Sequence, residues 1–128
     1  MTAVVAQFAA VGVGAAFGAW VRWGLSAWLN PRFPQWPLGT LAANLVGGYL
    51  IGIAIAFFVA RPGLSPEWQL FAITGLLGGL TTFSTFSAEV TQLLLRGDWL
   101  AGVGLAAIHL AGSLLLTVAG IATLRALA

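Results

Sequence analysis

The chain has 128 residues, of which 60% are hydrophobic and only 6% are charged. Soluble domains carry about 25% charged residues, so this composition excludes both an ordinary soluble domain and a disordered chain. The five basic residues are scattered Arg, which do not form the basic stripe of a nucleic-acid-binding protein. The sequence has no Cys, which excludes disulfides and thiol chemistry. The composition therefore predicts a small integral protein of the lipid bilayer that binds no nucleic acid.

Four apolar runs lie between the charged residues, and each is long enough to cross a bilayer, which takes about 20 residues. The connection at 30–37 contains three Pro and cannot stay helical, and Pro and Gly interrupt the chain again at 61–67. The connection at 96–98 is so short that the flanking helices must form an antiparallel hairpin. We predict an all-α membrane protein with one domain over residues 1–128 and four transmembrane helices, at about 3–29, 38–60, 67–95 and 99–126.

The basic residues in the short loops give no strong orientation signal, although such residues normally set membrane topology. With four helices, Arg61 and Arg125 share one side of the membrane, while Arg32 and Arg96 lie on the other, with Arg22 near a helix end. Two interpretations remain open. A weak bias selects one orientation, or copies insert both ways. Dual topology would permit an antiparallel homodimer, which is a closed two-fold assembly.

Small residues and one amide mark the first two predicted helices. Gly14 and Gly18 recur at four-residue spacing, which lets helices approach closely in lipid, within the chain or between chains. In the second helix Asn44 follows Thr40 by one turn and shares a face with Gly48. A polar group at membrane depth is costly and usually functional. Asn44 therefore either bonds a neighbouring helix or lines a polar path.

The third helix contains an unusual stretch near its middle. Gly75, Gly78 and Gly79 weaken the helix by about 1 kcal/mol each relative to Ala, and a run of Thr and Ser follows. We predict that this helix is broken near the membrane midplane, where irregular backbone is tolerated only inside protein or along a watery cavity. A break frees carbonyls that can hold a cation. The alternative is an unbroken helix in which the glycines permit a close crossing.

Two aromatic residues lie in this polar stretch. Phe83 and Phe86 are three residues apart, so they share one face of the half-helix that follows the predicted break. Their ring edges carry positive charge and can face a small anion, although ordinary packing is the alternative. The surrounding hydroxyl groups are those of Thr82, Ser84, Thr85 and Ser87.

The fourth helix carries a narrow polar stripe of His109, Ser113 and Thr117 at four-residue spacing. A lone His is more often a hydrogen-bonded packing residue than a ligand or proton carrier, and no second His exists to build a metal site. No Ser, His and acid set for nucleophilic catalysis is evident. We therefore expect a protein that is not an enzyme.

Three motifs together resemble the CrcB/Fluc family of fluoride channels, and the resemblance extends over all four helices. The first helix contributes Gly18-Ala19-Trp20-Val21-Arg22, and the second contributes Pro37-Leu38-Gly39-Thr40 with Asn44. The third and most specific motif is the run from Gly75 to Ser87. The resemblance implies a passive fluoride channel built as an antiparallel homodimer with two pores.

The resemblance also implies roles for individual residues. A structural sodium ion would lie at the dimer interface, held by the backbone carbonyls of Gly78 and Thr81 from both chains. Phe83 and Phe86 would line the pore with their ring edges, and Asn44 would bond the ion or orient the rings. Further residues would act nearby, namely the hydroxyls of Ser84, Thr85, Ser113 and Thr40, and Arg22 in a vestibule that attracts anions.

The function that follows from the resemblance is passive export of cytoplasmic fluoride, which lowers its toxicity, by a multi-pass protein of the bacterial plasma (inner) membrane. The alternative is a small multidrug-type four-helix transporter, which would need an acid in the first helix. The run from Ala3 to Val21 contains none. A non-conducting assembly subunit would explain the glycines but not the polar third helix.

Overall fold

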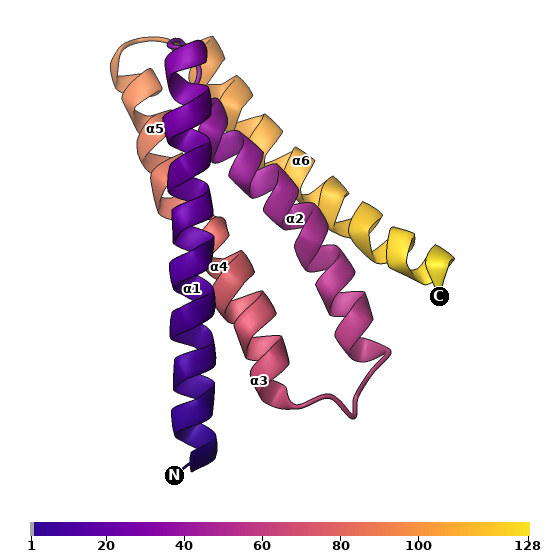
Figure 1. Ribbon diagram of the computed structural model, residues 1–128. Coiled ribbons are helices and arrows are strands. Elements are labelled where there is room, and N and C mark those ends of the chain that lie inside the picture. The colour runs from indigo at the N-terminus through magenta and orange to yellow at the C-terminus, as the bar shows by residue number, and fades with distance from the viewer. Residues whose placement is uncertain (1) are drawn as a thin grey trace.

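The computed structural model describes residues 2–128, and helices make up nearly all of this range (Figure 1). Four helical segments are long and apolar enough to cross a membrane, which confirms the predicted all-helical class with four spans. A short 3-10 turn at Asn30–Arg32 follows the first segment, and a π-helical stretch at Leu70–Leu77 lies inside the third. The α-helices are α1 (Thr2–Leu29), α2 (Leu38–Val59), α3 (Pro66–Gln69), α4 (Gly78–Leu80), α5 (Phe83–Leu95) and α6 (Trp99–Leu127).

Side chains and turn residues fix the connections between these helices. The side-chain oxygen of Asn30 accepts a hydrogen bond of 2.9 Å from the backbone N–H of Gly39, which ties the Pro-rich connection to the start of α2. Ser65 caps α3 by accepting from the backbone N–H of Glu67 at 3.3 Å. Gly97 has a φ of 81°, which glycine adopts without strain, and closes the tight turn between α5 and α6.

Glycines bring the helices into close pairs. A Cβ on Gly52 would collide with the carbonyl oxygen of Thr117, and one on Gly120 would collide with that of Tyr49, so α2 and α6 touch through their backbones. On the other side of the molecule, a Cβ on Gly79 would lie 2.5 Å from the carbonyl oxygen of Ala15 in α1. Figure 1 shows the two resulting pairs, α2 with α6 and α1 with the α3–α4 segment.

The third membrane-spanning segment, Pro66–Leu95, changes direction after its glycines. Gly75 lies in the π-helical stretch and Gly78 and Gly79 in α4, so the glycines themselves remain helical. The backbone becomes extended only at Thr81 (φ −90°, ψ 155°) and Thr82 (φ −152°, ψ 124°), before α5 begins. The interruption therefore comes later than the glycines, two of which, Gly75 and Gly79, permit the close crossing with α1.

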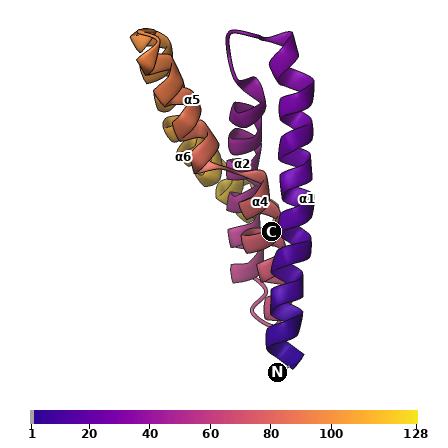
Figure 2. The same ribbon diagram turned by 90° about the vertical axis from the view of Figure 1, so that its left-hand side faces the viewer.

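This interruption transfers the chain from one neighbour to another. The π-helical stretch and α4 pack on α1, whereas α5 packs on α6. Figure 2 shows α5 leaning away from α1 and lying along α6. Thr81 and Thr82 are part-buried, and both line a cavity that residues of α2, α4 and α6 also border.

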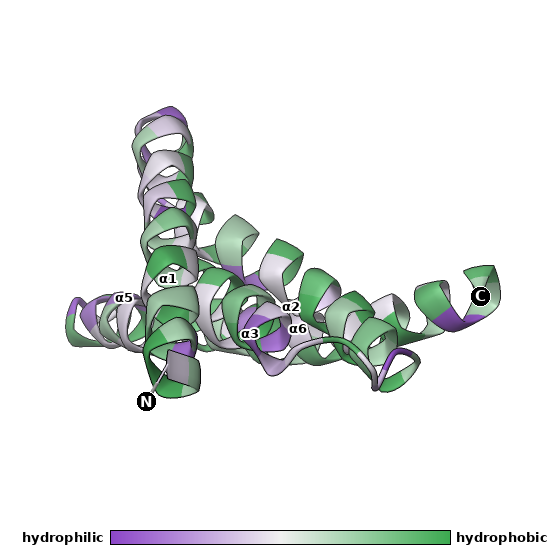
Figure 3. Ribbon diagram, turned by 60° about the horizontal axis from the view of Figure 1, so that its bottom comes forward, coloured by the Kyte–Doolittle hydropathy of each residue, from purple (hydrophilic) through white to green (hydrophobic). Residues whose placement is uncertain are grey.

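Most of the molecular surface is apolar. Large side chains on every span are exposed, including Phe8 (82%) and Leu100 (88%), and the hydrophobic colour covers most of α2 and α6 in Figure 3. The buried hydrophobic side chains are few, among them Ala43, Leu77 and Leu105. Such a surface suits a protein surrounded by lipid rather than by water.

Candidate functional site

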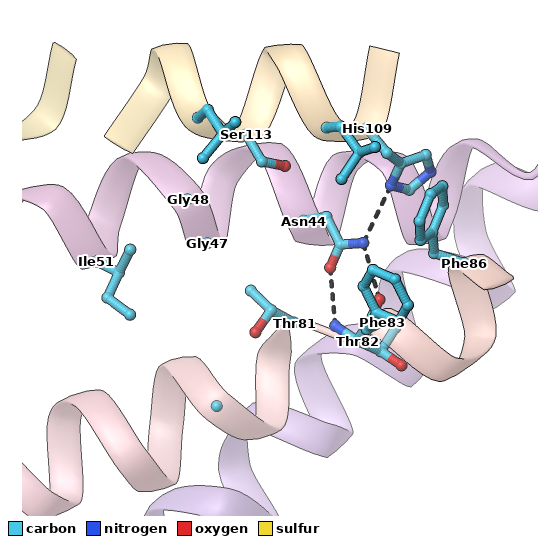
Figure 4. A pocket seen from close by; sticks show the side chains of 13 residues that line it. Asn44, Gly47, Gly48, Ile51, Thr81, Thr82, Phe83, Phe86, His109 and Ser113 are labelled. Carbon is cyan, nitrogen blue, oxygen red and sulfur yellow. Dashed lines mark hydrogen bonds between the residues drawn. The ribbon is translucent and has the colours of Figure 1, made fainter. Parts of the chain in front are cut away.

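A cavity of about 510 Å³ lies beside the interruption of the third span. It opens to one side of the chain, and α2, α4, α5 and α6 all contribute to its wall (Figure 4). Several residues that the sequence analysis singled out line this cavity: Asn44, Gly78, Thr81, Phe83, Phe86, His109 and Ser113.

Asn44 binds both backbone groups of Thr82. The amide oxygen of Asn44 accepts from the backbone N–H of Thr82 at 2.8 Å, and its amide nitrogen donates to the carbonyl of Thr82 at 3.0 Å. The amide nitrogen also donates to Nδ1 of His109 at 3.1 Å. These bonds replace the helical partners that an extended residue lacks, so Asn44 stabilises the interruption.

Thr82 also begins the next helix. Its side-chain oxygen accepts from the backbone N–H of Thr85 at 3.2 Å, which is an N-cap bond. The hydroxyl of Ser84 lies 3.3 Å from the same oxygen. The sequence pattern of Thr and Ser therefore has a local structural role, because it supplies the cap of α5.

Two backbone carbonyls at the interruption lose their usual helical donors. In a continuous helix the carbonyl of Gly78 would accept from the N–H of Thr82, but that N–H donates to Asn44. The carbonyl of Thr81 would accept from the N–H of Thr85, which donates to the side chain of Thr82 instead. Gly78 and Thr81 both line the cavity. Two oxygen ligands of the kind that hard cations prefer are thus released at one place.

The aromatic residues form a continuous series of ring contacts at one end of the cavity. The rings of Phe83 and Phe86 are 5.3 Å apart and meet edge to face at 76°. The ring of Phe86 lies 4.4 Å from that of His109, tilted by 34°. Phe86 is 6% exposed but Phe83 is 72% exposed, so the two rings lie on the same face of α5 but only Phe86 is buried.

The polar stripe of α6 contacts α2 along its length. The hydroxyl of Thr117 donates to the carbonyl of Gly48 at 3.0 Å and also lies 2.9 Å from the carbonyl of Ser113. His109 contacts Asn44 one turn earlier in α2. This stripe therefore consists of interhelical contacts, and Ser113 lies on the cavity wall between them.

Four further residues of the predicted site do not line the cavity. Thr40 is buried and donates to the carboxylate of Glu89 at 2.7 Å. Arg22 donates through Nε to the carbonyl of Gly79 at 3.1 Å, near the end of α4. Ser84 and Thr85 lie at the start of α5, outside the cavity wall.

Sequence reasoning missed two features of this region. It did not identify the backbone of Thr82 as the group that Asn44 binds. It also assigned no partner to Glu89, whose second carboxylate oxygen is buried without a hydrogen-bond partner among residues 2–128. A signal for the second feature existed, because Glu89 is the one acid inside an apolar run.

The arrangement defines a class of protein: a helical membrane protein with a cavity at an interrupted helix and polar groups on its wall, as in channels and transporters. The model of the family described as CrcB-like protein, Camphor Resistance (CrcB), matches residues 9–121. The chain belongs to this family, which confirms the resemblance inferred from its motifs.

Curated relatives match the chain over most of its length. A protein of Thiobacillus denitrificans named fluoride-specific ion channel FluC is 62% identical over 118 residues, which are 92% of this chain and 95% of the relative. The protein of the same name from Pseudomonas putida is 62% identical over 89% of this chain and 90% of its own. The one from Cupriavidus metallidurans is 61% identical over 94% and 96%.

Proposed function

We propose that this chain is a fluoride channel that passively exports cytoplasmic fluoride, and not an enzyme. The observation that carries the proposal is the full-length similarity to relatives named fluoride-specific ion channels, at about 60% identity. The cavity fits this function, because its wall combines amide, hydroxyl and aromatic groups and contains no charged side chain.

Neutral donors suit a path for fluoride. A channel must bind the ion well enough to replace its hydration shell and weakly enough to release it. The positive edges of Phe83 and Phe86 and the hydroxyl of Ser113 attract an anion without neutralising it. Protonated fluoride crosses lipid and ionises in a less acidic cytoplasm, so a passive path lets the anion leave down its electrochemical gradient.

The functional unit of the channel would be an antiparallel homodimer with dual topology. In a single chain the cavity opens to one side, and Phe83 on its wall is 72% exposed. A second copy would cover this face and enclose two paths. The near balance of Arg residues between the two loop sides supports insertion in both orientations.

A structural sodium ion at the dimer interface forms a further part of the proposal. The carbonyls of Gly78 and Thr81 lack their helical donors, both residues line the cavity, and carbonyl oxygens suit a hard cation. A single chain supplies only two such oxygens, so both copies would have to contribute. When bound, the ion would supply positive charge that joins the two interrupted helices.

The interruption of the third span would lie near the membrane midplane. The interruption at Thr81 and Thr82 divides a span of 30 residues near its centre, which supports a depth near the membrane midplane. Arg22 would attract anions at a vestibule, although its Nε is bound to the carbonyl of Gly79. The membrane would be the bacterial inner membrane, which the protein crosses several times.

The test is a flux assay with purified protein in liposomes. Liposomes loaded with potassium fluoride should release fluoride when valinomycin lets potassium leave with it, without a proton gradient. Liposomes loaded with chloride should release little. A multidrug-type transporter would instead move organic cations in exchange for protons, and the absence of fluoride release would overturn the proposal.

A further inference from the structure

Two basic residues from distant parts of the chain meet at one cleft. Figure 1 shows the end of α2, at Val59, and the end of α6, at Leu127, on the same side of the molecule. A cleft of about 170 Å³ lies between these ends, and Arg61 and Arg125 both line it. The cleft therefore combines two positive charges with a wall of apolar side chains, which are those of Ala56, Ala60, Leu124, Leu127 and Ala128.

The cleft begins where the glycine contacts between α2 and α6 end. A Cβ on Gly120 would lie 2.9 Å from the backbone nitrogen of Ile53, so the two backbones touch at this level. Leu124 follows one turn later in α6, and it lines the cleft together with the small side chains of Ala56 and Ala60 on α2. These small side chains leave an apolar space at a surface that faces lipid, and an acyl chain is the apolar group that such a surface meets.

No carboxylate side chain lines this cleft. The chain has three acidic residues, all within the described range 2–128, and none of them contributes to the wall. Glu67, the acid nearest to Arg61 in sequence, accepts a hydrogen bond from the hydroxyl of Ser65. The guanidinium carbon of Arg61 lies 4.2 Å from the centre of the Phe57 ring, a cation–π contact that helps to fix the guanidinium. The charge of the cleft therefore suits an anion.

The cleft lies at the depth of lipid headgroups. Arg61 comes just after the membrane-spanning segment Leu38–Val59, and Arg125 lies in the last turn of Trp99–Leu127. The polar headgroups of a bilayer lie at the ends of membrane-spanning helices, and basic pockets between such helices bind anionic headgroups. A guanidinium can pair with two phosphate oxygens at once, which suits Arg for this role. The charge of the cleft and its depth therefore indicate the same class of ligand.

We propose that this cleft binds an anionic phospholipid, with the phosphate on Arg61 and Arg125 and an acyl chain against the apolar wall. The site shares no lining residue with the cavity at the interrupted third span, so it does not depend on the fluoride path proposed above. The alternative role of the two Arg is to offset the negative C-terminal ends of α2 and α6, which would give no preference for a lipid headgroup.

Native mass spectrometry of the full chain in a neutral detergent tests the proposal. The protein is titrated with phosphatidylglycerol, which carries a net negative charge, or with zwitterionic phosphatidylcholine that has the same acyl chains. A basic residue near an anionic lipid contributes roughly fivefold in affinity, so the two Arg should give a preference for phosphatidylglycerol of about thirtyfold. Equal binding of the two lipids would overturn the proposal, because the guanidinium groups would then hold no anionic headgroup.

Charge variants locate the preference on the molecule. Arg61→Gln combined with Arg125→Gln should bind the two lipids about equally. Arg32→Gln combined with Arg96→Gln is the matched control, because it removes the same charge from residues that do not line the cleft, and it should keep the full preference. Loss of the preference in both pairs, or its survival in the first pair, would overturn the assignment to this cleft.

A third variant leaves both charges in place and remains informative if the charge variants fail to elute as a single species. Ala60→Phe places a ring in the apolar part of the cleft. It should weaken binding of phosphatidylglycerol about tenfold, which corresponds to roughly two methylene groups that lose their contact. Unchanged affinity would contradict the proposal, since no acyl chain would then occupy the cleft.

Inorganic phosphate distinguishes the two sources of a phosphate group. A soluble anion lacks the acyl chain, so phosphate at the concentration of the lipid should not displace phosphatidylglycerol from the unaltered protein. Displacement by phosphate alone would overturn the lipid assignment and identify the cleft as a site for a soluble anion.

Discussion

Replacing Asn44 with Ala should weaken the interrupted third span more than any other single amide deletion. The substitution removes three hydrogen bonds, two to the backbone of Thr82 and one to His109. Each buried group left without a partner costs about 1–3 kcal/mol, so a dry site would lose about 3–9 kcal/mol. Because the cavity is open and water can reach part of it, we expect the lower end, about 3 kcal/mol.

Asn30→Ala is a matched control for this prediction. It deletes the same amide but removes a single bond, to the backbone N–H of Gly39 in a connection, and should cost about 1 kcal/mol. The assay is the fraction of protein that still elutes as a single species after heating, together with fluoride efflux from liposomes. Equal heat resistance of Asn44→Ala and Asn30→Ala, with normal flux in both, would refute the view that Asn44 holds the interruption in place.

Three further predictions concern the proposed channel. Phe83→Leu and Phe86→Leu keep apolar bulk at a cost usually below about 1.5 kcal/mol of stability, so the protein should still purify. Both variants lose the positive ring edge, so fluoride flux should fall sharply. Trp20→Leu should lower the flux much less, and normal flux in the Phe variants would make them packing residues. Replacing sodium with a large organic cation should reduce the dimer fraction if Gly78 and Thr81 hold sodium, and an unchanged fraction would argue against that site. Two Lys added to one terminus should fix one orientation and lower activity, whereas a fully active single-orientation population would exclude the antiparallel dimer.

Much of the fold could be predicted because the signals were local. The few charged residues separate apolar runs long enough to span a membrane, and Pro and Gly mark the connections. The position of the interruption was less accessible. Glycine weakens an isolated helix, but Gly75 and Gly79 gain close contact with Val11 and Ala15 of α1 and remain helical. Tertiary packing thus overrides propensity at these positions.

The candidate site was predicted in its residue types but not in its connections. The spacing of Phe83 and Phe86 correctly indicated a shared helical face, since their rings meet at 5.3 Å. The bonds between Asn44 and Thr82 join residues 38 positions apart, and no local pattern specifies such a pair. The same holds for Thr40 and Glu89, which are 49 positions apart. Only the assembled fold identifies these partners.

The central claim is that the protein conducts fluoride passively and selectively, and a reversal-potential measurement in a planar bilayer tests it most directly. With a fluoride gradient and equal chloride on both sides, the reversal potential should change by about 59 mV for each tenfold change in the fluoride ratio. A potential that stays at zero under the fluoride gradient, or one that follows an imposed chloride gradient, would contradict the account.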